Sequence, residues 1–335
     1  MISGRYTNDG VATLRLNPLQ EKTKAVLVQK LQSGEYSYET LSDCPLCNSK
    51  DQELLAEKDR YGIENTVAVC KDCGLVMTNP RMTQESYTGF YNDIQKKLYV
   101  GEERPSGDYF VRQKNKGKEI YEFLQRGGLV SDKQAMQVLE IGCGAGGILA
   151  YFQDQGHEVK GMDIGTTYIE FGKEKGLNIA DGFLKDLSTT HKYDLIIYSH
   201  VMEHILDVAE ELELIKSYLK PGGVLYIEVP GIKNVYQKYK MDYLTYFQSA
   251  HTFHFSLTTL KNWLSAAGYD CLVGTEFVRS AFRLTESDDS NEYKRKNDYE
   301  AVTKHIAKVD RYRSLFPLTP YFFKMKLAGL KQKFK

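Results

Sequence analysis

A short apolar stretch that breaks into glycines, at residues 136–147, is the feature that most constrains the fold of this chain. It begins as a strand-like run, passes through Gly142, Gly144 and Gly147, and continues into an apolar segment typical of a helix. A strand that enters a helix through glycines lets backbone N–H groups approach a ligand, because no Cβ stands in the way. The stretch therefore predicts a nucleotide-type site at the carboxyl end of a parallel strand.

The glycines alone do not identify the nucleotide. Their spacing also fits the dinucleotide fingerprint, with Asp163 at about the offset of a ribose-binding acid. Glu140 favours another ligand, since it would lie near the pyrophosphate of a dinucleotide, whereas a ligand with a sulfonium and an ammonium group accepts a carboxylate there. Residues 140–146 resemble the glycine-rich motif of class I S-adenosylmethionine-dependent methyltransferases. The alternative is a tight strand–helix turn that binds nothing.

Strand and helix patterns alternate beyond this motif, which predicts a parallel sheet. The resemblance implies a Rossmann-like α/β fold with a seven-stranded, mostly parallel sheet and helices on both faces. We expect strands at residues 137–141, 157–163, 178–180, 193–200 and 224–229, and one or two more within 271–284. Helices are expected at 18–34, 106–124, 147–155, 168–175, 208–219 and 257–267.

The resemblance also implies S-adenosylmethionine as cofactor. It places Asp163 on the ribose hydroxyls and Phe183 near the adenine, where the family often has an aspartate instead, so that stacking would replace a polar contact. The residues expected to bind the cofactor are Glu140, Gly142, Gly144, Asp163, Ile164, Phe183 and His200.

Four of the six cysteines form two CxxC pairs, Cys44 with Cys47 and Cys70 with Cys73, separated by 22 residues with a hairpin-like sequence. Two turns that each offer two thiolates predict a tetrahedral Cys₄ zinc site in a small zinc ribbon. The alternative is unrelated thiols in turns. Together with Tyr87, this region resembles a zinc-binding module that precedes many bacterial methyltransferases, lies over the catalytic domain and helps to form the acceptor site.

Three candidate catalytic residues follow the predicted strand 193–200. If the backbone turns helical there, His200, Glu203 and His204 share one face. His200 is nearest the strand end and is the candidate general base, with Glu203 orienting it or His204. In the alternative interpretation, Glu203 and His204 hold the loop by hydrogen bonds.

A second cluster of aromatic and histidine side chains contains His251, the fourth catalytic candidate. It resembles the acceptor segment of zinc-containing sugar C-methyltransferases, which typically carry Glu-His where this chain has Ala250-His251. Loss of that glutamate favours O- or N-methylation over C-methylation. Aromatic residues beside polar ones suit a sugar ring, and they also suit core packing. The members are Tyr243, Tyr246, Phe247, His251, His254 and Phe255.

The C-terminal tail is basic. Residues 303–335 contain nine lysines or arginines and one acid, Asp310, with apolar residues between them. This pattern fits an amphipathic helix with weak peripheral contact to an anionic membrane, and a solvated helix docked on its own domain is the favoured alternative. The apolar residues are Phe322, Phe323, Met325, Leu327, Leu330 and Phe334.

We therefore expect five regions: an N-terminal helical segment (1–40), a Cys₄ zinc-binding module (41–80), a helical linker (81–127), a methyltransferase domain (128–285) and a basic helical tail (286–335). The predicted acceptor is a small molecule or glycan precursor, most simply a sugar or nucleotide sugar. The rivals are a zinc-ribbon RNA methyltransferase, which zero net charge and an acidic ribbon disfavour, and a non-enzymatic zinc-ribbon binding protein. Residues 1–17 lack the apolar stretch of a signal peptide, so a cytoplasmic protein is expected, with contact at the inner membrane face through the tail.

Overall fold

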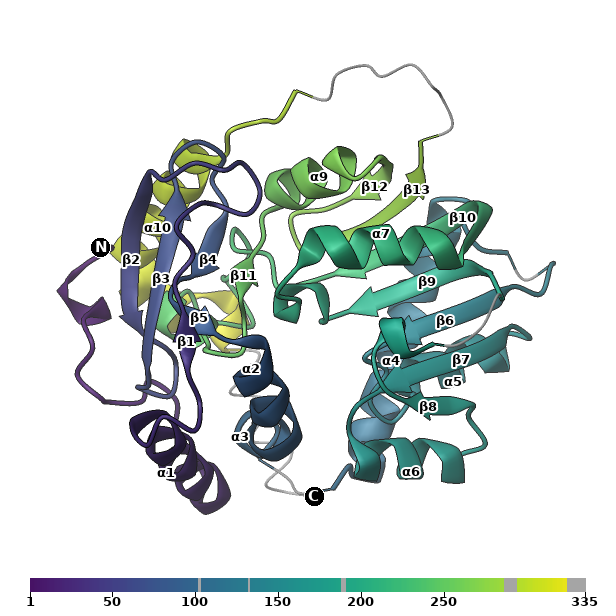
Figure 1. Ribbon diagram of the computed structural model, residues 1–335, viewed down its shortest axis with the longest axis horizontal. Helices are drawn as coiled ribbons and strands as arrows, with labels where there is room; N and C mark the ends of the chain where they lie inside the picture. The colour runs from purple at the N-terminus through teal and green to yellow at the C-terminus, as the bar shows by residue number, and fades with distance from the viewer. Residues whose placement is uncertain (102–103, 132, 188–190, 286–293, 324–335) are drawn as a thin grey trace.

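The computed structural model describes residues 1–101, 104–131, 133–187, 191–285 and 294–323. Two sheets lie side by side in it, a larger one built from the middle of the chain and a smaller one built mainly from its beginning (Figure 1).

The larger sheet has seven strands in the order β12-β13-β10-β9-β6-β7-β8. The five strands from β10 to β8 are parallel, and only β13 runs opposite to its neighbours β10 and β12. This confirms the Rossmann-like, mostly parallel sheet, with an antiparallel part at one edge. The strands are β6 (Gln137–Ile141), β7 (Glu158–Asp163), β8 (Ile179–Asp181), β9 (Tyr193–Ser199), β10 (Leu219–Glu228), β12 (Tyr269–Gly274) and β13 (Arg279–Leu284).

Strand β10 begins five residues earlier than the sequence pattern predicts. Leu219 already pairs with Tyr193, and the register then shifts before Val224 pairs with Leu195. The intervening turn contains Gly222 in the left-handed region, with φ of 72°. The Pro-Gly-Gly segment is therefore an irregularity within the strand's span and not a separate loop before it.

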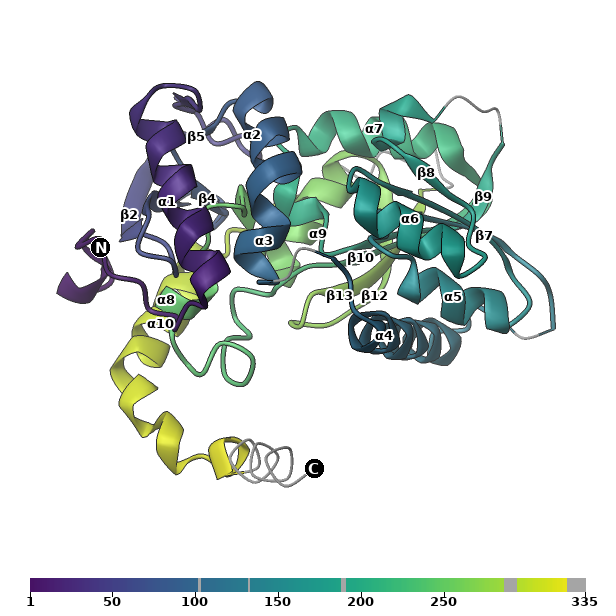
Figure 2. The ribbon, with the colours of Figure 1, turned by 90° about the horizontal axis from the view of Figure 1, so that it is seen from below.

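Helices cover both faces of this sheet because neighbouring strand residues point to opposite sides. Leu195 and Ile197 face one layer of helices, α4 (Gly107–Arg126), α5 (Gly147–Asp154) and α6 (Thr166–Glu174). Ile196 and Tyr198 face the other layer, α7 (Val208–Tyr218) and α9 (Leu257–Ala266). Figure 2 shows α4 and α5 below the sheet.

The smaller sheet has four strands in the order β11-β4-β3-β2, and all its pairings are antiparallel. Its first three strands come from the cysteine-containing region, but β11 comes from the segment after β10. The strands are β2 (Gln52–Lys58), β3 (Glu64–Cys70), β4 (Val76–Thr78) and β11 (Phe253–His254). Around it lie β1 (Tyr38–Glu39) with β5 (Arg81–Met82), the helices α1 (Pro18–Gln32), α2 (Gln84–Phe90), α3 (Lys96–Tyr99) and α8 (Tyr243–Tyr246), the 3₁₀ helix η1 (Gly4–Tyr6) and the π-helix η2 (Tyr91–Gln95). Two further 3₁₀ helices, η3 (Leu184–Asp186) and η4 (Met202–His204), follow β8 and β9 of the larger sheet.

The C-terminal helix α10 (Tyr299–Tyr312) returns to the smaller sheet. Its apolar face, Val302, Ile306 and Val309, is buried in the same core as Val67 and Val69 of β3. That face is therefore occupied by the protein itself. The following turn η5 (Arg313–Leu318) extends away from the body in Figure 2. The predicted tail residues from 324 onward lie outside the described residues, and membrane contact stays a prediction.

None of the helices in the described ranges is long and apolar enough to span a lipid bilayer.

Candidate active site

The loop between β6 and α5 adopts the open glycine conformation that the sequence predicts. Gly142 and Gly144 both have positive φ, 67° and 57°. A Cβ on Gly142 would lie 2.5 Å from Cγ2 of Val201, the residue after His200, and one on Gly144 would lie 3.2 Å from the hydroxyl of Tyr109. A side chain at Gly142 would therefore force the β9 loop away from the glycine loop.

Two carboxylates flank this loop. Asp163, at the end of β7, accepts hydrogen bonds from the backbone N–H groups of Gly144 (2.8 Å) and Gly165 (2.9 Å). Glu140 is 2% exposed, and its Oε2 has no hydrogen-bond partner within the described part of the chain. Burial, and then the charge of Asp163, raises the pKa of Glu140 well above its usual range. A cationic ligand here would supply the missing partner, as expected for the ammonium or sulfonium of S-adenosylmethionine.

A cavity of about 780 Å³ opens beside Asp163, and Ile164 and Phe183 both line it. One wall belongs to the larger sheet and the other to α2 and η2 of the N-terminal region. The remaining lining residues are Thr88, Tyr91, Asn92, Asp93, Lys97, Arg104, Gly165, Thr166, Thr167, Tyr168, Asp181, Gly182 and Asp186. Of the residues expected to bind the cofactor, Glu140, Gly142, Gly144, Asp163 and His200 lie outside this lining.

Two tyrosines lie close to the glycine loop and to the cavity. The ring of Tyr109 in α4 packs edge-on against Tyr168, with centroids 5.5 Å apart. Tyr91 lines the cavity, and its ring also packs edge-on against His204, at 5.4 Å. Tyr91 therefore joins the cofactor cavity to the histidine cluster. No sequence motif marks Tyr109 as part of the site, and its only signal is its place near the capped start of α4.

His200 lies at the carboxyl end of β9 in an uncommon conformation, with φ of 59°. Its backbone N–H donates to the carbonyl of Glu228 (2.7 Å), and its Nδ1 lies 3.3 Å from Oε1 of Glu203. When this imidazole is neutral, Nδ1 donates to the carboxylate, which can only accept, and Nε2 keeps its lone pair. A non-glycine residue held at positive φ often marks a functional position.

A salt-bridge network holds Glu228, the residue whose backbone carbonyl accepts from His200. The carboxylate of Glu228 accepts from Lys116 (2.6 Å), Tyr226 (2.7 Å) and Arg279 (3.3 Å). Burial alone would raise the pKa of Glu228, but the positive charges around it outweigh burial and lower that pKa to about 2. Glu228 is therefore ionised and fully engaged, so it holds the strand end and is not a free base.

Glu203, His204 and His251 form a compact buried cluster, although they come from two different loops. Oε1 of Glu203 lies 3.9 Å from Nε2 of His204 and 4.0 Å from Nε2 of His251. Nδ1 of His204 donates to the carbonyl of Ala250 (2.6 Å), and Gln248 contacts Nε2 of His251. The three ligand atoms lie within 4.8 Å of one another, a geometry that suits either a hydrogen-bonded base or a divalent metal ion.

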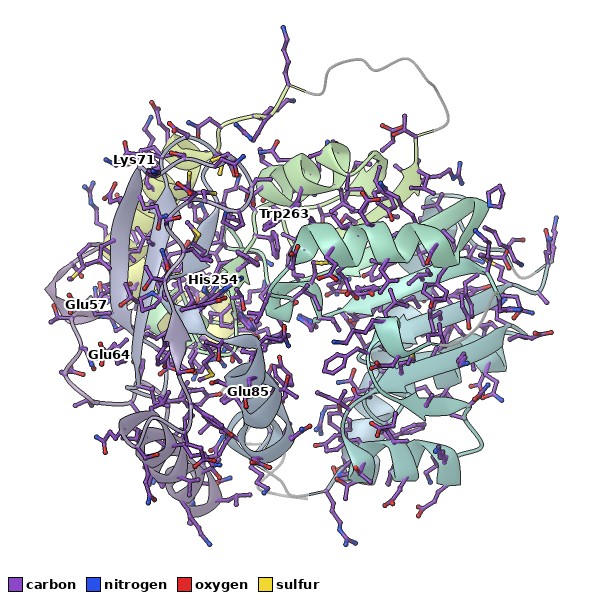
Figure 3. All side chains as sticks on the ribbon, in the orientation of Figure 1. Glu57, Glu64, Lys71, Glu85, His254 and Trp263 are labelled. Atoms are coloured by element: carbon purple, nitrogen blue, oxygen red, sulfur yellow. The ribbon has the colours of Figure 1, made fainter. Side chains whose placement is uncertain are left out.

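His254 continues the cluster toward the smaller sheet, where Figure 3 shows it on the inner side. It is 1% exposed, between the rings of Tyr246 and Phe247, and neither ring nitrogen has a hydrogen-bond partner within the described residues. Burial lowers the pKa of His254 to about 3, and burial also lowers the pKa values of His204 and His251. These three imidazoles are therefore neutral near pH 7.

The four CxxC cysteines meet at one end of the smaller sheet. The sulfur of Cys44 lies 3.6 Å from that of Cys73, and the sulfur of Cys47 lies 3.4 Å from that of Cys70. Sulfurs bound to one tetrahedral zinc ion are separated by about 3.8 Å, so the arrangement suits such an ion.

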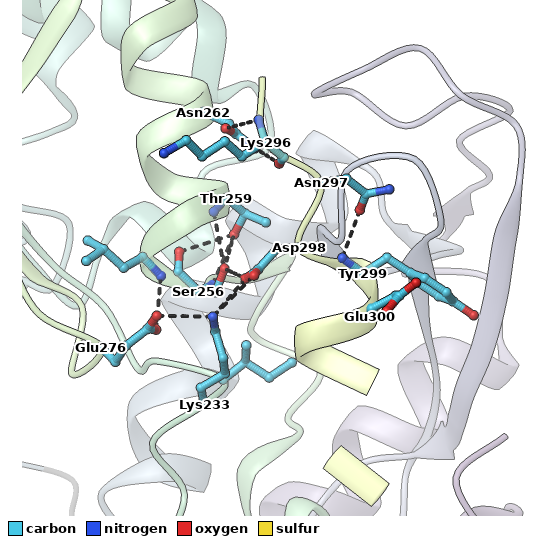
Figure 4. A network of polar contacts seen from close by, with 12 residues as sticks. Lys233, Ser256, Thr259, Asn262, Glu276, Lys296, Asn297, Asp298, Tyr299 and Glu300 are labelled. Atoms are coloured by element: carbon cyan, nitrogen blue, oxygen red, sulfur yellow. Dashed lines mark hydrogen bonds and ion pairs between the residues drawn. The ribbon is translucent and has the colours of Figure 1, made fainter. Parts of the chain in front are cut away.

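The segment before α10 packs against these cysteine turns, and Figure 4 shows the polar contacts of its residue Asp298 with Ser256 and Lys233. The backbone N–H of Asp298 donates to the carbonyl of Cys73 (3.2 Å), and its carboxylate accepts from Ser256 at the start of α9 (2.5 Å) and from Lys233 (3.0 Å). A Cβ on Gly74 would lie 2.5 Å from the carbonyl carbon of Asp298. The C-terminal segment thus ties the cysteine cluster to the larger sheet.

Comparison with known proteins agrees with this geometry. Residues 112–273 match the family model described as a methyltransferase domain. A ubiquinone biosynthesis O-methyltransferase from Serratia proteamaculans is 29% identical over 110 residues, which are 30% of this chain and 44% of that protein. The corresponding protein from Histophilus somni is 30% identical over 135 residues, 36% of this chain and 55% of that protein. The chain thus spans about half the length of these relatives.

A solved structure of an S-adenosylmethionine-dependent methyltransferase from Archaeoglobus fulgidus is 24% identical and has a TM-score of 0.38, covering 58% of this chain and 88% of that one. The family model and the relatives support a class I S-adenosylmethionine-dependent methyltransferase domain in this chain.

The cofactor assignment predicts that Asp163→Ala weakens S-adenosylmethionine binding about tenfold to a hundredfold, because a hydrogen bond to a charged group is worth about 1.5–3 kcal/mol. Isothermal titration calorimetry measures this directly. The matched control is Asp270→Ala, since Asp270 is exposed on β12, at the edge of the sheet that lies farthest from β7 and β8. Equal affinity in the native protein and Asp163→Ala would overturn the assignment.

The buried histidines predict a loss of stability in mild acid. Between pH 6.5 and about 3 the unfolded chain binds a proton at His254 while the folded chain does not, so falling pH favours unfolding. At pH 5 this single group costs up to about 2 kcal/mol. His254→Phe, which keeps the packing of a ring, should therefore flatten the decline of the free energy of unfolding from pH 7 to pH 5. His191→Phe, at an exposed position, should leave the decline unchanged, and an equally steep decline in His254→Phe would contradict the prediction.

Proposed function

We propose that this chain, through its methyltransferase domain, transfers the methyl group of S-adenosylmethionine to a small-molecule acceptor. The observation that carries the proposal is the position of Tyr91, which lines the cavity beside Asp163 and contacts His204. The predicted cofactor site and the buried histidines are thus adjacent parts of one site. When bound, the sulfonium supplies an electrophilic methyl group for in-line displacement.

His200 is the proposed general base. As the acceptor oxygen or nitrogen forms its bond to the methyl carbon, the carbon–sulfur bond breaks and the acceptor's proton passes to Nε2 of His200. Glu203 holds Nδ1 of the same ring and stabilises the imidazolium that forms. His204 has a positioning role, because its Nδ1 is already engaged with Ala250. His251 is proposed to orient the acceptor from the opposite loop.

The proposed acceptor is a sugar or nucleotide sugar, as in a glycan precursor. The rings of Tyr239, Tyr246 and Phe247 are buried in one hydrophobic core near His254, so the sugar assignment rests on the resemblance of this segment to sugar methyltransferases and not on these rings. Ala250 offers no carboxylate to remove a proton from carbon, which favours O- or N-methylation. The relatives' printed function, O-methylation, favours oxygen.

We further propose that Cys44, Cys47, Cys70 and Cys73 hold one zinc ion with a structural role. Three of the four are fully buried and all four sulfurs lie within 4.8 Å of one another, so no ligand position is left for water. Its function is to hold the turns on which the segment before α10 packs.

The two rival functions have less support. An RNA methyltransferase needs a basic face, but the chain is electrically neutral and the outer side of the smaller sheet carries Glu57 and Glu64 (Figure 3). A non-enzymatic binding protein has no evident use for the buried, unpartnered carboxylate of Glu140 beside an open glycine loop. A cytoplasmic location stays a prediction from the sequence.

The proposed base predicts that His200→Ala lowers kcat by at least about a hundredfold, the usual contribution of general-base catalysis. Affinity for S-adenosylhomocysteine should change little. The assay follows transfer of a labelled methyl group into small molecules extracted from cells that lack the protein. His191→Ala is the matched control because His191 is exposed. Near-native turnover in His200→Ala would show that proximity alone carries the reaction.

The zinc proposal predicts about one zinc ion per chain in protein purified without chelator, measured by elemental analysis. Cys70→Ser should lose most of the metal and loosen the smaller sheet while S-adenosylhomocysteine still binds. Cys271→Ser, outside the cluster on β12, should retain the metal. Native protein without zinc would refute the assignment.

A further inference from the structure

We propose that Glu203, His204 and His251 bind one divalent transition-metal ion, at a site distinct from the four cysteines. The first two side chains come from η4 and the third from the loop before β11. Binding of the ion stands independently of the reaction, whereas its role toward the acceptor rests on the proposed function.

The three side chains are close enough to share an ion. Oε1 of Glu203 lies 3.9 Å from Nε2 of His204 and 4.0 Å from Nε2 of His251, and the three ligand atoms all lie within 4.8 Å of one another. Two atoms that each bind zinc at about 2.0–2.2 Å are at most about 4.4 Å apart. Both measured separations fall within this limit, so small rotations of the side chains would bring all three onto one ion.

The carboxylate of Glu203 lacks both a hydrogen bond and a permanent countercharge. Glu203 is 1% exposed, and its Oε2 has no hydrogen-bond partner in the described ranges. Over the same ranges, the groups within ion-pair distance of this carboxylate are three histidines, His200, His204 and His251, and no lysine or arginine. A buried carboxylate without a compensating charge is costly. A divalent cation would supply that charge.

The backbone contact of His204 leaves the correct nitrogen free for a metal ion. Its Nδ1 donates to the carbonyl of Ala250 (2.6 Å), to which the hydroxyl of Tyr87 also donates. In the neutral ring, a proton on Nδ1 leaves the lone pair on Nε2, the nitrogen 3.9 Å from Glu203. Metal-binding histidines commonly donate their second ring nitrogen to a carbonyl, which fixes the tautomer and the orientation of the ring.

His251 is held beside Glu203 by its own loop. The hydroxyl of Thr78 donates to the carbonyl of His251 (2.8 Å), and the next N–H, of Thr252, donates to the carbonyl of Glu203 (2.9 Å). His251 is 3% exposed, and its Nδ1 has no hydrogen-bond partner among the described residues. The side-chain amide of Gln248 contacts Nε2. Rotation of this amide would turn its oxygen toward the same place and make Gln248 a fourth ligand.

Two imidazoles and one carboxylate select the class of ion. Imidazole suits zinc, iron, nickel and copper, whereas magnesium and calcium prefer oxygen ligands throughout. Three protein ligands also leave a position open, as in catalytic metal sites. Glu203 can bind the ion through Oε2 while its Oε1 accepts from Nδ1 of His200. The ion would hold the acceptor hydroxyl in the open position and lower its pKa, which favours transfer of its proton to His200.

The test is titration of the zinc-loaded full chain with Co²⁺, followed by visible absorption. Native protein should bind about one Co²⁺ per chain with nitrogen and oxygen ligands, and therefore without the intense sulfur-to-cobalt charge-transfer band of a thiolate site. Glu203→Gln and His251→Phe should each weaken Co²⁺ binding more than about a hundredfold, because loss of an outer-shell partner alone costs about tenfold to a hundredfold.

The matched control is His254→Phe, the same change at a buried histidine whose ring lies 5.7 Å from that of His251. It should bind Co²⁺ as the native protein does. S-adenosylhomocysteine should bind every variant with native affinity, which shows that each one is folded. The spectrum of native protein requires no variant, so it decides the question even where a substitution prevents folding.

Three results would overturn the metal site. They are native protein that binds no Co²⁺ outside thiolate ligands, folded Glu203→Gln and His251→Phe that bind Co²⁺ with native affinity, and His254→Phe that loses Co²⁺ as His251→Phe does. Failure of S-adenosylhomocysteine to bind native protein, with Co²⁺ bound as expected, would instead refute the proposed function and leave the metal site standing.

Discussion

The antiparallel pairing of β11 with β4 is the contact on which the site depends. Phe253 and His254 lie in the segment that follows β10 of the larger sheet, and they pair with Met77 and Val76 of the smaller sheet. Just before them, Thr252 donates its backbone N–H to the carbonyl of Glu203 (2.9 Å), and its own carbonyl accepts from Thr78 (2.9 Å). One residue thus bridges the two sheets through its backbone. His251 is consequently held beside Glu203, and the catalytic candidates from two distant loops form a single buried cluster.

Two buried ionisable groups lack part of their hydrogen bonding. Glu140 and Arg60 are both buried, and each has an atom without a hydrogen-bond partner within the described part of the chain. Such groups weaken a fold unless a ligand supplies their partner. A cationic cofactor beside Glu140 would favour the ionised carboxylate and offset the rise in pKa that burial causes. The neutral, buried His251 and His254 lie on the acceptor side.

Local sequence signals predicted much of this architecture. The strand–glycine–helix unit at 137–154 follows from apolar residues that stop at glycines, and the cysteine turns follow from CxxC spacing. The contact of His251 with Glu203 could not be derived in the same way, because it depends on a backbone pairing between segments about 175 residues apart, which no local pattern encodes. The burial of Arg60, between β2 and β3, likewise has no local signal in the sequence. Its burial arises from Tyr99 and from the loop at Ser249, both distant in sequence.

The central claim is that the cofactor's sulfur faces the histidine cluster across Tyr91. A crystal structure of the protein with bound S-adenosylhomocysteine tests it most directly. The account predicts the ribose on Asp163, the amino group toward Glu140, and the sulfur on the side of His200, with open space between the sulfur and His251. A cofactor whose sulfur points toward α6, away from His200, would contradict the account even if the affinity were high.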